Sequence, residues 1–219
     1  MGRPPKIVED AIQKGVTEGK NGKGSIFVFA SGNGRLKCDN CSFDGYTNSI
    51  YSITVGAIGF RDNHPGYSES CTSVMISAYS SNSKKKITTS TSCNNECTSQ
   101  NGGISAAAPM VAGIIALALP KRPDLMWHDF QYITVQSAVP FNLDNPSWDK
   151  TWQGHPYSMG FGFGCIYGYK FVHHTLAFKN MRPQVFYDTP IIKIHYPIPK
   201  GKQGLVSMIY INLSSLAPS

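Results

Sequence analysis

The sequence predicts a layered α/β fold built around a mainly parallel sheet. Three short apolar runs have the composition of strands buried on both faces, and segments with helical spacing stand before and after them in the chain. Helices that alternate with such strands are typical of a parallel sheet covered by helices. With 219 residues, of which 41% are hydrophobic, the chain is long enough for one domain with a sizeable core and a piece of another.

The amino-terminal elements are a helix followed by the strands. Residues 6–14 carry apolar side chains at helical spacing, and Gly15 and Gly19 then interrupt the pattern. Short runs rich in β-branched and aromatic residues predict three buried strands, at 25–30, 50–58 and 74–79. The first strand ends in the glycine-flanked loop "SGNG", residues 31–34, at a position where α/β sheets carry functional groups.

Two further helices follow the strands. Residues 104–119 form an apolar segment predicted as the long central helix, and residues 124–138 form an amphipathic one that starts at Asp124. After about residue 180 the chain is rich in β-forming residues and prolines without a helical period, so we expect a domain boundary at 178–184. The roughly 40 residues beyond it are too few to form a sheet domain alone.

Composition and charge exclude several classes of protein. The net charge is +7, but the dense basic cluster Lys84 to Lys86 lies in a Ser-rich stretch without interleaved aromatic residues. We therefore expect a solvated loop and no nucleic-acid partner. Apolar runs fall short of the roughly 18 residues that a membrane-spanning helix needs, so we expect no such segment in the chain. The opening "MGRPPKIVED" lacks the apolar core of a signal peptide.

The cysteines indicate an oxidising compartment. The chain has six of them: Cys38, Cys41, Cys71, Cys93, Cys97 and Cys165. Two close pairs, Cys38 with Cys41 and Cys93 with Cys97, have spacings that also occur in zinc sites. Their surroundings are polar and rich in Ser and Thr, without a compact knuckle, so disulfides formed in a secretory compartment are favoured over zinc.

Ser105 and Asn33 each allow two interpretations when their segments are taken alone. In "GGISAAAPMVAG", residues 102–113, the serine is either a catalytic nucleophile or an N-cap whose oxygen accepts from the first free N–H groups of the helix. In "FVFASGNG", residues 27–34, the asparagine either donates its side-chain amide to a developing oxyanion or fills a left-handed turn position. Alone, each segment favours the non-catalytic interpretation.

Several long blocks together carry a family resemblance. "ASGNG" followed by "G-x-S-A-A-A-P" resembles the subtilisin-like serine proteases. "VFASGNG", "CDNCSFDGYTNSIYSITVGAI", "HPGYSESC" and "GGISAAAPMVAG" resemble the kexin and furin branch, the proprotein convertases. "GVTEGKNGKGSIFVFASGNG" and "SAVPF" favour the fungal kexins within that branch.

The resemblance covers about residues 5–180 and implies a fold. That fold is a partial subtilisin-like three-layer α/β/α arrangement with a mainly parallel sheet. Residues 1–180 would be the carboxyl-terminal portion of the catalytic domain. Residues 181–219 would be the first strands of the β-sandwich P domain that follows it in the convertases.

The resemblance also implies catalytic roles. Ser105 matches the nucleophile, whose attack on the scissile carbonyl gives an acyl-enzyme. The backbone N–H of Ser105 and the side chain of Asn33 match the oxyanion hole. Asp44, in "FDGYTN", matches a carboxylate that binds the basic side chain just before the cleaved bond.

A calcium site and disulfides follow from the same resemblance. Asp39 and Glu69 match ligands of a calcium ion beneath the specificity pocket, and hard oxygen ligands suit that cation. Cys41 and Cys71 match a disulfide, and Cys97 matches half of another whose partner would lie upstream. The other three cysteines have no family counterpart.

Parts of the family pattern are absent or changed. The Asp and His blocks of the triad precede the serine in the family, and nothing before Ser25 resembles them, so we expect a fragment that is inert alone. Ile104 stands where the family has threonine, Arg35 replaces a glycine and Tyr167 replaces an aspartate.

The nearby histidines are not expected to supply the missing base. Asp62 and His64 precede the serine, but they are expected to be structural. The adjacent His128 and Asp129 are expected on a solvated helix face.

The resemblance therefore implies a serine endopeptidase that cleaves protein or propeptide substrates after basic pairs such as Lys-Arg or Arg-Arg, with calcium as cofactor. Its parent protein is expected in the secretory pathway, at a late-Golgi-like membrane, or at the cell surface, and to be membrane-anchored. The alternative is a non-catalytic paralogue that acts as a surface or interaction protein.

Overall fold

The computed structural model describes residues 4–92 and 96–182. The chain divides into two compact units, residues 1–183 and 184–219, and the described residues belong to the first. This division falls within the predicted boundary region at 178–184. The expected P-domain strands lie outside the described residues, so that assignment stays a prediction.

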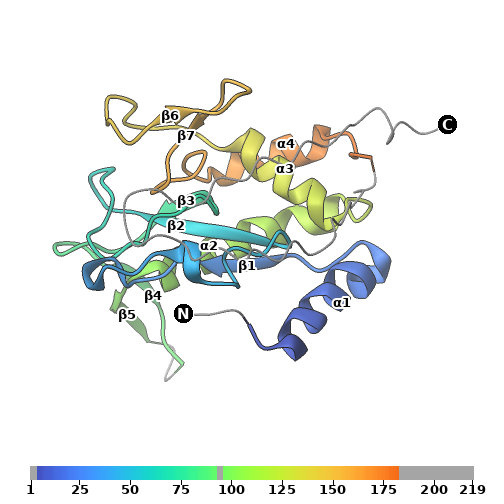
Figure 1. Ribbon diagram of the computed structural model, residues 1–219, viewed down its shortest axis with the longest axis horizontal. Helices are drawn as coiled ribbons and strands as arrows, with labels where there is room; N and C mark the ends of the chain where they lie inside the picture. The colour runs from blue at the N-terminus through green and yellow to red at the C-terminus, as the bar shows by residue number, and fades with distance from the viewer. Residues whose placement is uncertain (1–3, 93–95, 183–219) are drawn as a thin grey trace, which may run out of the picture. The chain divides into compact units, whose positions relative to one another are not determined.

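A three-stranded parallel sheet forms the centre of the first unit (Figure 1). Its strands are β1 (Phe27–Ala30), β2 (Ser52–Ile58) and β3 (Val74–Tyr79), in the order β1-β2-β3. All three predicted strands are therefore confirmed. Every residue of the middle strand β2 is buried, which explains why its sequence is apolar without alternation.

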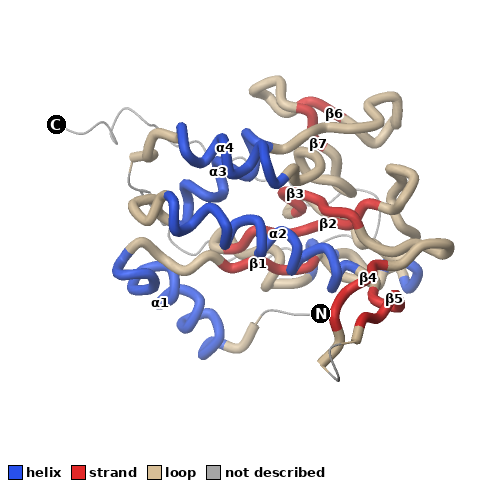
Figure 2. Tube along the Cα trace, turned by 180° about the vertical axis from the view of Figure 1, so that it is seen from behind, coloured by secondary structure: helices blue, strands red, loops and turns tan. Residues whose placement is uncertain are grey.

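Helix α2 (Ile104–Ala118) packs against all three strands and against α4 (Gly168–Ala177). Figure 2 shows α2 in front of the sheet, with α3 (Trp127–Ser137) and α4 beside it. The main hydrophobic core lies between these helices and the sheet, and its largest fully buried members are Ile53, Val55, Ile76, Leu125, Phe130, Ile133 and Phe171. The predicted layered α/β class is confirmed.

Helix α1 (Lys6–Gly22) runs beyond its predicted end, because Gly15 does not interrupt it. A Cβ at Gly15 would lie 2.6 Å from the Phe27 ring, so the glycine gives β1 room to approach the helix. The helical conformation is lost only from Gly19, which has a ψ of 155°.

Short polar strands and α4 were not predicted. β4 (Ile87–Ser90) and β5 (Cys97–Asn101) form an antiparallel pair, as do the two-residue strands β6 (Asp149–Lys150) and β7 (Pro156–Tyr157). Their Ser/Thr-rich or very short sequences carry no apolar alternation to reveal them.

Helix α3 begins at Trp127, not at Asp124. The Oδ2 of Asp129 accepts a hydrogen bond from the Met126 N–H at 2.8 Å. An acidic residue in the first turn of the helix therefore caps its N-terminus. Asp124 instead forms an ion pair with the guanidinium of Arg122 at 2.8 Å.

The predicted solvated face of α3 is wrong. Both His128 and Asp129 are buried. The Oδ1 of Asp129 accepts from the Met181 N–H at 2.9 Å, a contact between residues 52 positions apart that helical periodicity does not reveal.

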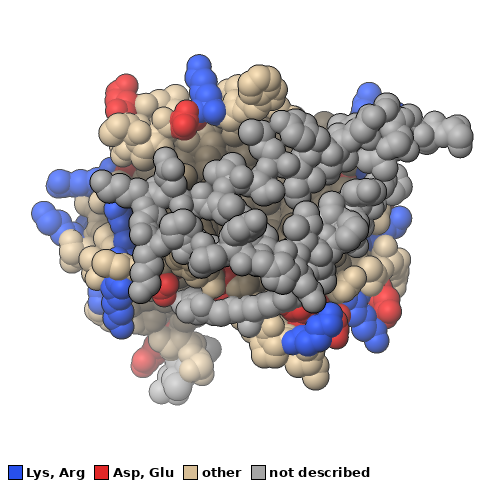
Figure 3. All heavy atoms as spheres, viewed as in Figure 1, with Lys and Arg blue, Asp and Glu red and all other residues tan. Residues whose placement is uncertain are grey.

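The basic cluster at residues 84–86 is exposed, as expected of a solvated loop. On the face shown in Figure 3, the visible Lys and Arg side chains occupy several separate places with Asp and Glu among them. That visible part of the described surface carries no single continuous basic patch of the kind that nucleic-acid binding favours.

Within residues 4–92 and 96–182, the segment Ile104–Lys121 is long and apolar enough, by length and composition alone, to cross a membrane. Most of this segment is α2, which packs on the sheet. The expected absence of a membrane-spanning segment stays a prediction.

Candidate active site

Ser105 lies in the first turn of α2 and is not its N-cap. The N-cap is Gly103, with a φ of 71°, and no side chain caps this helix end. Ser105 is exposed, and its hydroxyl takes part in none of the hydrogen bonds found among the described residues. The capping interpretation is therefore wrong, and the hydroxyl is open to a reacting group.

Asn33 reaches the same helix end from the loop after β1. Its Oδ1 accepts a hydrogen bond from the Ile104 N–H at 3.0 Å. Asn33 is not among the residues with positive φ, so the left-handed turn interpretation is also wrong. Because Oδ1 is engaged, the free Nδ2–H₂ group of this exposed side chain can donate beside Ser105.

The contact between the Asn33 side chain and the N-terminus of α2 depends on Gly103. A Cβ built at that position would lie 3.1 Å from the Asn33 Oδ1, and the positive φ disfavours a side chain independently. The Ser105 N–H is one of the first helix N–H groups, which have no intrahelical acceptor and carry the positive end of the helix dipole. Two donors, the Asn33 amide and this N–H, therefore converge on one region.

A second set of predicted residues, Asp39 and Glu69, surrounds the backbone of the Asn33 loop. Glu69 is 0% exposed, and its Oε1 accepts from the Gly34 N–H at 2.7 Å. A Cβ at Gly34 would lie 2.8 Å from Glu69 Oε1 and 3.1 Å from Asp39 Oδ2, so both carboxylates flank this glycine. Gly32, with a φ of 121°, leaves room for the Glu69 carboxylate on the other side.

The environment of Glu69 fits a bound divalent cation. Its Oε2 is buried and has no hydrogen-bond partner. Burial raises the pKa of the Glu69 carboxyl above its ordinary value, and the nearby charges of Asp39 and Asp44 raise it further. A hard cation would satisfy the orphaned oxygen and offset the repulsion between the carboxylates. Among the described residues, however, no group of three or more His, Cys, Asp or Glu side chains is arranged to hold a metal.

Asp44 is half-buried near this cluster and keeps one carboxylate oxygen available. Its Oδ1 accepts from the Tyr46 N–H at 3.0 Å, and no hydrogen bond to its Oδ2 is found in the described part of the chain. No ion pair to Asp44 is found there either. The free oxygen can accept from an incoming cation.

The predicted disulfide is confirmed. Cys41 and Cys71 are bonded, with a Cα–Cα distance of 5.5 Å. The bond ties the loop that carries Asp39 and Asp44 to the loop that carries Glu69. Cys38, Cys97 and Cys165 are free, and Cys93 lies outside the described residues.

No described histidine contacts the Ser105 hydroxyl. His64 is bound elsewhere, because its Nδ1 lies 2.5 Å from the Arg35 Nη1. Burial lowers the pKa of His64 to about 4, and the adjacent Arg35 charge contributes to that shift. Asp62 accepts from the Tyr79 hydroxyl at 2.6 Å. Both residues thus have other partners, as expected of structural residues.

The three residues that depart from the family pattern have different surroundings in the structure. Ile104 is fully buried and offers no hydroxyl near Ser105. Tyr167 is exposed at the start of α4. Arg35, which stands in place of a glycine of the family pattern, contacts His64, and nothing in the spacing of the two residues indicates that contact.

Comparisons with known proteins show the family to which the chain belongs. The subtilase family model (Peptidase S8) matches residues 1–164. The chain is similar to kexin of Candida albicans (46% identity over 198 residues, 90% of this chain and 21% of that protein). It is also similar to kexin of Saccharomyces cerevisiae (43% over 215 residues, 97% and 26%). Furin-1 of Xenopus laevis is 39% identical over 190 residues, 86% of this chain and 24% of that protein.

Solved structures show the same fold. A serine protease of Aeromonas sobria superimposes with a TM-score of 0.74 at 15% identity, covering 84% of this chain and 42% of that one. The chain spans about a fifth to a quarter of the length of the curated relatives named above.

Proposed function

This chain belongs to the subtilase family, and we propose that it forms part of the catalytic domain of a serine endopeptidase that processes protein precursors at basic sites. The observation that carries the proposal is the hydrogen bond from the Ile104 N–H to the Asn33 Oδ1. That bond holds the Asn33 side chain at the helix end at which the exposed Ser105 stands and leaves its amide nitrogen free to donate.

In the proposed mechanism, the Ser105 Oγ attacks the scissile carbonyl carbon and the carbonyl oxygen becomes an oxyanion. The Asn33 Nδ2–H₂ and the Ser105 N–H donate to that oxyanion, and the dipole of α2 favours its charge. The base that took the Ser105 proton gives it to the amine as the tetrahedral intermediate collapses. The amine then departs and leaves an acyl-enzyme, which water hydrolyses.

The attack requires a base to take the proton of Ser105. A serine hydroxyl at its ordinary pKa is a weak nucleophile without an adjacent imidazole. Because no described histidine contacts Ser105, we expect the 219-residue chain by itself to be inert. The activity belongs to a protein in which an Asp and a His are supplied beside this site.

Asp44 is proposed to select the basic side chain before the cleaved bond. Its free carboxylate oxygen can pair with a guanidinium or ammonium group, and it has no competing ion-pair partner among the described residues. A relative in Yarrowia lipolytica, 42% identical over 99% of this chain, is named a dibasic-processing endoprotease, which supports this choice of substrate.

Asp39 and Glu69 are proposed to hold a calcium ion. The ion would neutralise the buried charge of Glu69 and fix the Asn33 loop through the Gly34 N–H bond to the same carboxylate. The disulfide between Cys41 and Cys71 supports a location of the parent protein in the secretory pathway or at the cell surface, where such bonds persist.

A chimera tests the proposal. The matching segment of Saccharomyces cerevisiae kexin, to which this chain is 43% identical, is replaced by this chain, and cleavage of a fluorogenic peptide after Lys-Arg is measured. We expect cleavage that disappears in Ser105→Ala and that loses its preference for basic residues in Asp44→Asn.

One outcome of this experiment would overturn the proposal, and one measurement on the isolated chain would overturn the expectation that it is inert. A folded, secreted chimera without activity would favour the non-catalytic alternative. Cleavage by the isolated chain that depends on Ser105 would show that a base is already present in it.

A further inference from the structure

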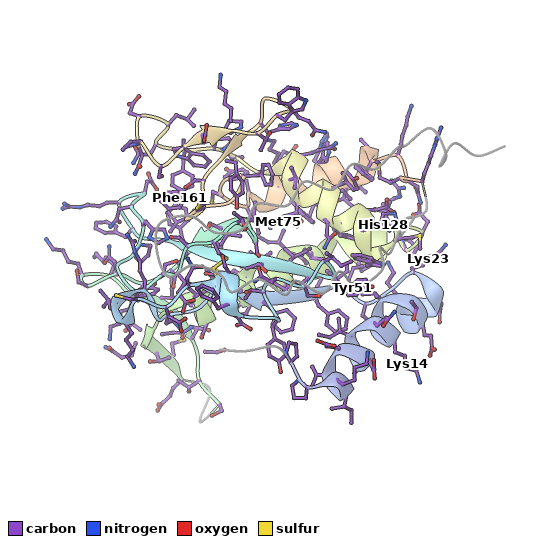
Figure 4. The ribbon with its side chains drawn as sticks, in the orientation of Figure 1. Lys14, Lys23, Tyr51, Met75, His128 and Phe161 are labelled. Atoms are coloured by element: carbon purple, nitrogen blue, oxygen red, sulfur yellow. A yellow bond between two sulfur atoms is a disulfide. The ribbon has the colours of Figure 1, made fainter. Side chains whose placement is uncertain are left out.

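A cavity of about 620 Å³ is lined by neither Asn33 nor Ser105 and has no part in the proposed mechanism. Three segments line it: Arg35 from the loop after β1, His64 and Ser70 from the loop between β2 and β3, and residues of 145–161. Figure 4 places Phe161, which lines the cavity, on the side of the molecule that carries β6 and β7. This volume is typical of a small-molecule or side-chain pocket.

One wall of the cavity is aromatic. The rings of Trp148 and Phe161 stack, with their centroids 5.9 Å apart and their planes at 20°. His64 packs edge-on against the same Phe161 ring at 5.4 Å. Such a wall can cover the flat or apolar body of a ligand.

Trp148 also carries an unsatisfied donor. Its Nε1 is buried and has no hydrogen-bond partner in the structure. A buried N–H without an acceptor is costly, and in native proteins such a group usually has a partner. Because this atom is buried, a ligand in the cavity contacts the Trp148 ring and does not reach its N–H.

Arg35 is an uncompensated cation held at a fixed place. Its Nη1 donates to the His64 Nδ1 at 2.5 Å, so the ring is neutral and cannot balance the guanidinium charge. The lowered pKa of His64 keeps it neutral at physiological pH. No carboxylate pairs with Arg35 among the described residues, and the residue is exposed. Asp149, the acidic residue of the lining, accepts from the Lys150 N–H at 2.7 Å.

We propose that this cavity binds a peptide carboxylate next to an aromatic or large apolar side chain. The carboxylate pairs with the free edge of the Arg35 guanidinium, which has the planar fork that matches two carboxylate oxygens. The apolar side chain lies against Trp148 and Phe161. His64 orients the guanidinium beforehand, so less side-chain entropy is lost on binding.

Two kinds of peptide group can supply a carboxylate next to an aromatic side chain. A peptide offers it as a C-terminal carboxylate on an aromatic residue, or as an acidic side chain beside one. The first probe is therefore N-acetyl-phenylalanine, the second is acetyl-Glu-Phe-amide, and N-acetyl-phenylalanine amide is the matched probe without charge. The site does not depend on the proposed catalytic role, and its test uses binding alone.

The test is a titration of the ¹⁵N-labelled chain followed by NMR. The indole Nε1–H signal of Trp148 is assigned with Trp148→Phe, because the chain has three tryptophans. We expect millimolar binding of one charged probe that moves this signal, and at least tenfold weaker binding of the uncharged amide. Whichever charged probe binds identifies the source of the carboxylate.

Two variants test whether the charge of Arg35 is responsible for binding the charged probe. Arg35→Gln should weaken binding of the charged probe at least tenfold, whereas Arg61→Gln should leave it unchanged. Arg61 is an exposed arginine of the same loop as His64 but does not line the cavity, and its guanidinium lies 5.7 Å from the Phe60 ring. Equal binding of the charged and uncharged probes, no shift of the Trp148 signal at 20 mM (about twenty times a millimolar Kd), or unchanged binding by Arg35→Gln would each overturn the proposal.

Discussion

Replacing both Cys41 and Cys71 by alanine would remove the cross-link between the two loops that carry the predicted carboxylates. The bond closes a segment of 30 residues in sequence. Restricting a loop of that length in the unfolded chain stabilises the folded state by about 3.6 kcal/mol at 25 °C. Both sulfurs are buried and pack with Val74, so the alanines also leave a small space in this cluster.

The assay is urea unfolding of the oxidised chain followed by circular dichroism. With a slope of about 2 kcal/mol per molar urea, the double variant should lose about 1.8 M from its midpoint. Cys97→Ser is the control, since Cys97 is free and exposed, and it should change the midpoint little. A double variant that unfolds within about 0.3 M of the parent, a difference of about 0.6 kcal/mol at that slope, would refute the loop-restriction argument.

Three further predictions concern single groups. Arg122→Ala should lower the free energy of unfolding by about 2 kcal/mol in urea, because its Nη1 donates to the Thr175 and Phe178 carbonyls at the end of α4. Calcium should raise the thermal midpoint of the chain in a calorimeter and should not raise that of Glu69→Gln, because the variant lacks the buried charge. The C2 proton of His64 should titrate by NMR with a pKa of about 4. Because that pKa is lowered by folding, the stability this ring contributes is present above its ordinary value of 6.5 and is lost as the pH falls from there toward 4.

Burial on both faces is the reason that the strands could be predicted from sequence. β2 is buried at every position, so its composition depends on packing alone and stands out from the polar loops. The hairpin of β4 and β5 is mostly exposed and rich in Ser and Thr, and local sequence does not separate it from a loop. The buried state of His128 and Asp129 depends on a distant backbone N–H, so the amphipathic pattern of α3 did not indicate it.

The candidate site was predictable in part for a similar reason. The end of β1 and the start of α2 each carry short glycine-flanked segments, and family resemblance named one residue in each. Residue patterns alone did not reveal which atoms meet there, since the Ile104 N–H that engages Asn33 belongs to the backbone. The contact of Arg35 with His64 was missed because it joins two loops with no common motif.

The turnover of the Asn33→Ala variant in the kexin chimera tests the central claim most directly. The claim is that Asn33 and the N-terminus of α2 form one oxyanion site around Ser105. If it holds, kcat for a Lys-Arg peptide falls by about 10²- to 10³-fold while KM changes little, because the lost donor acts on the transition state. A kcat within about threefold of the parent chimera, less than 1 kcal/mol of barrier, would contradict it.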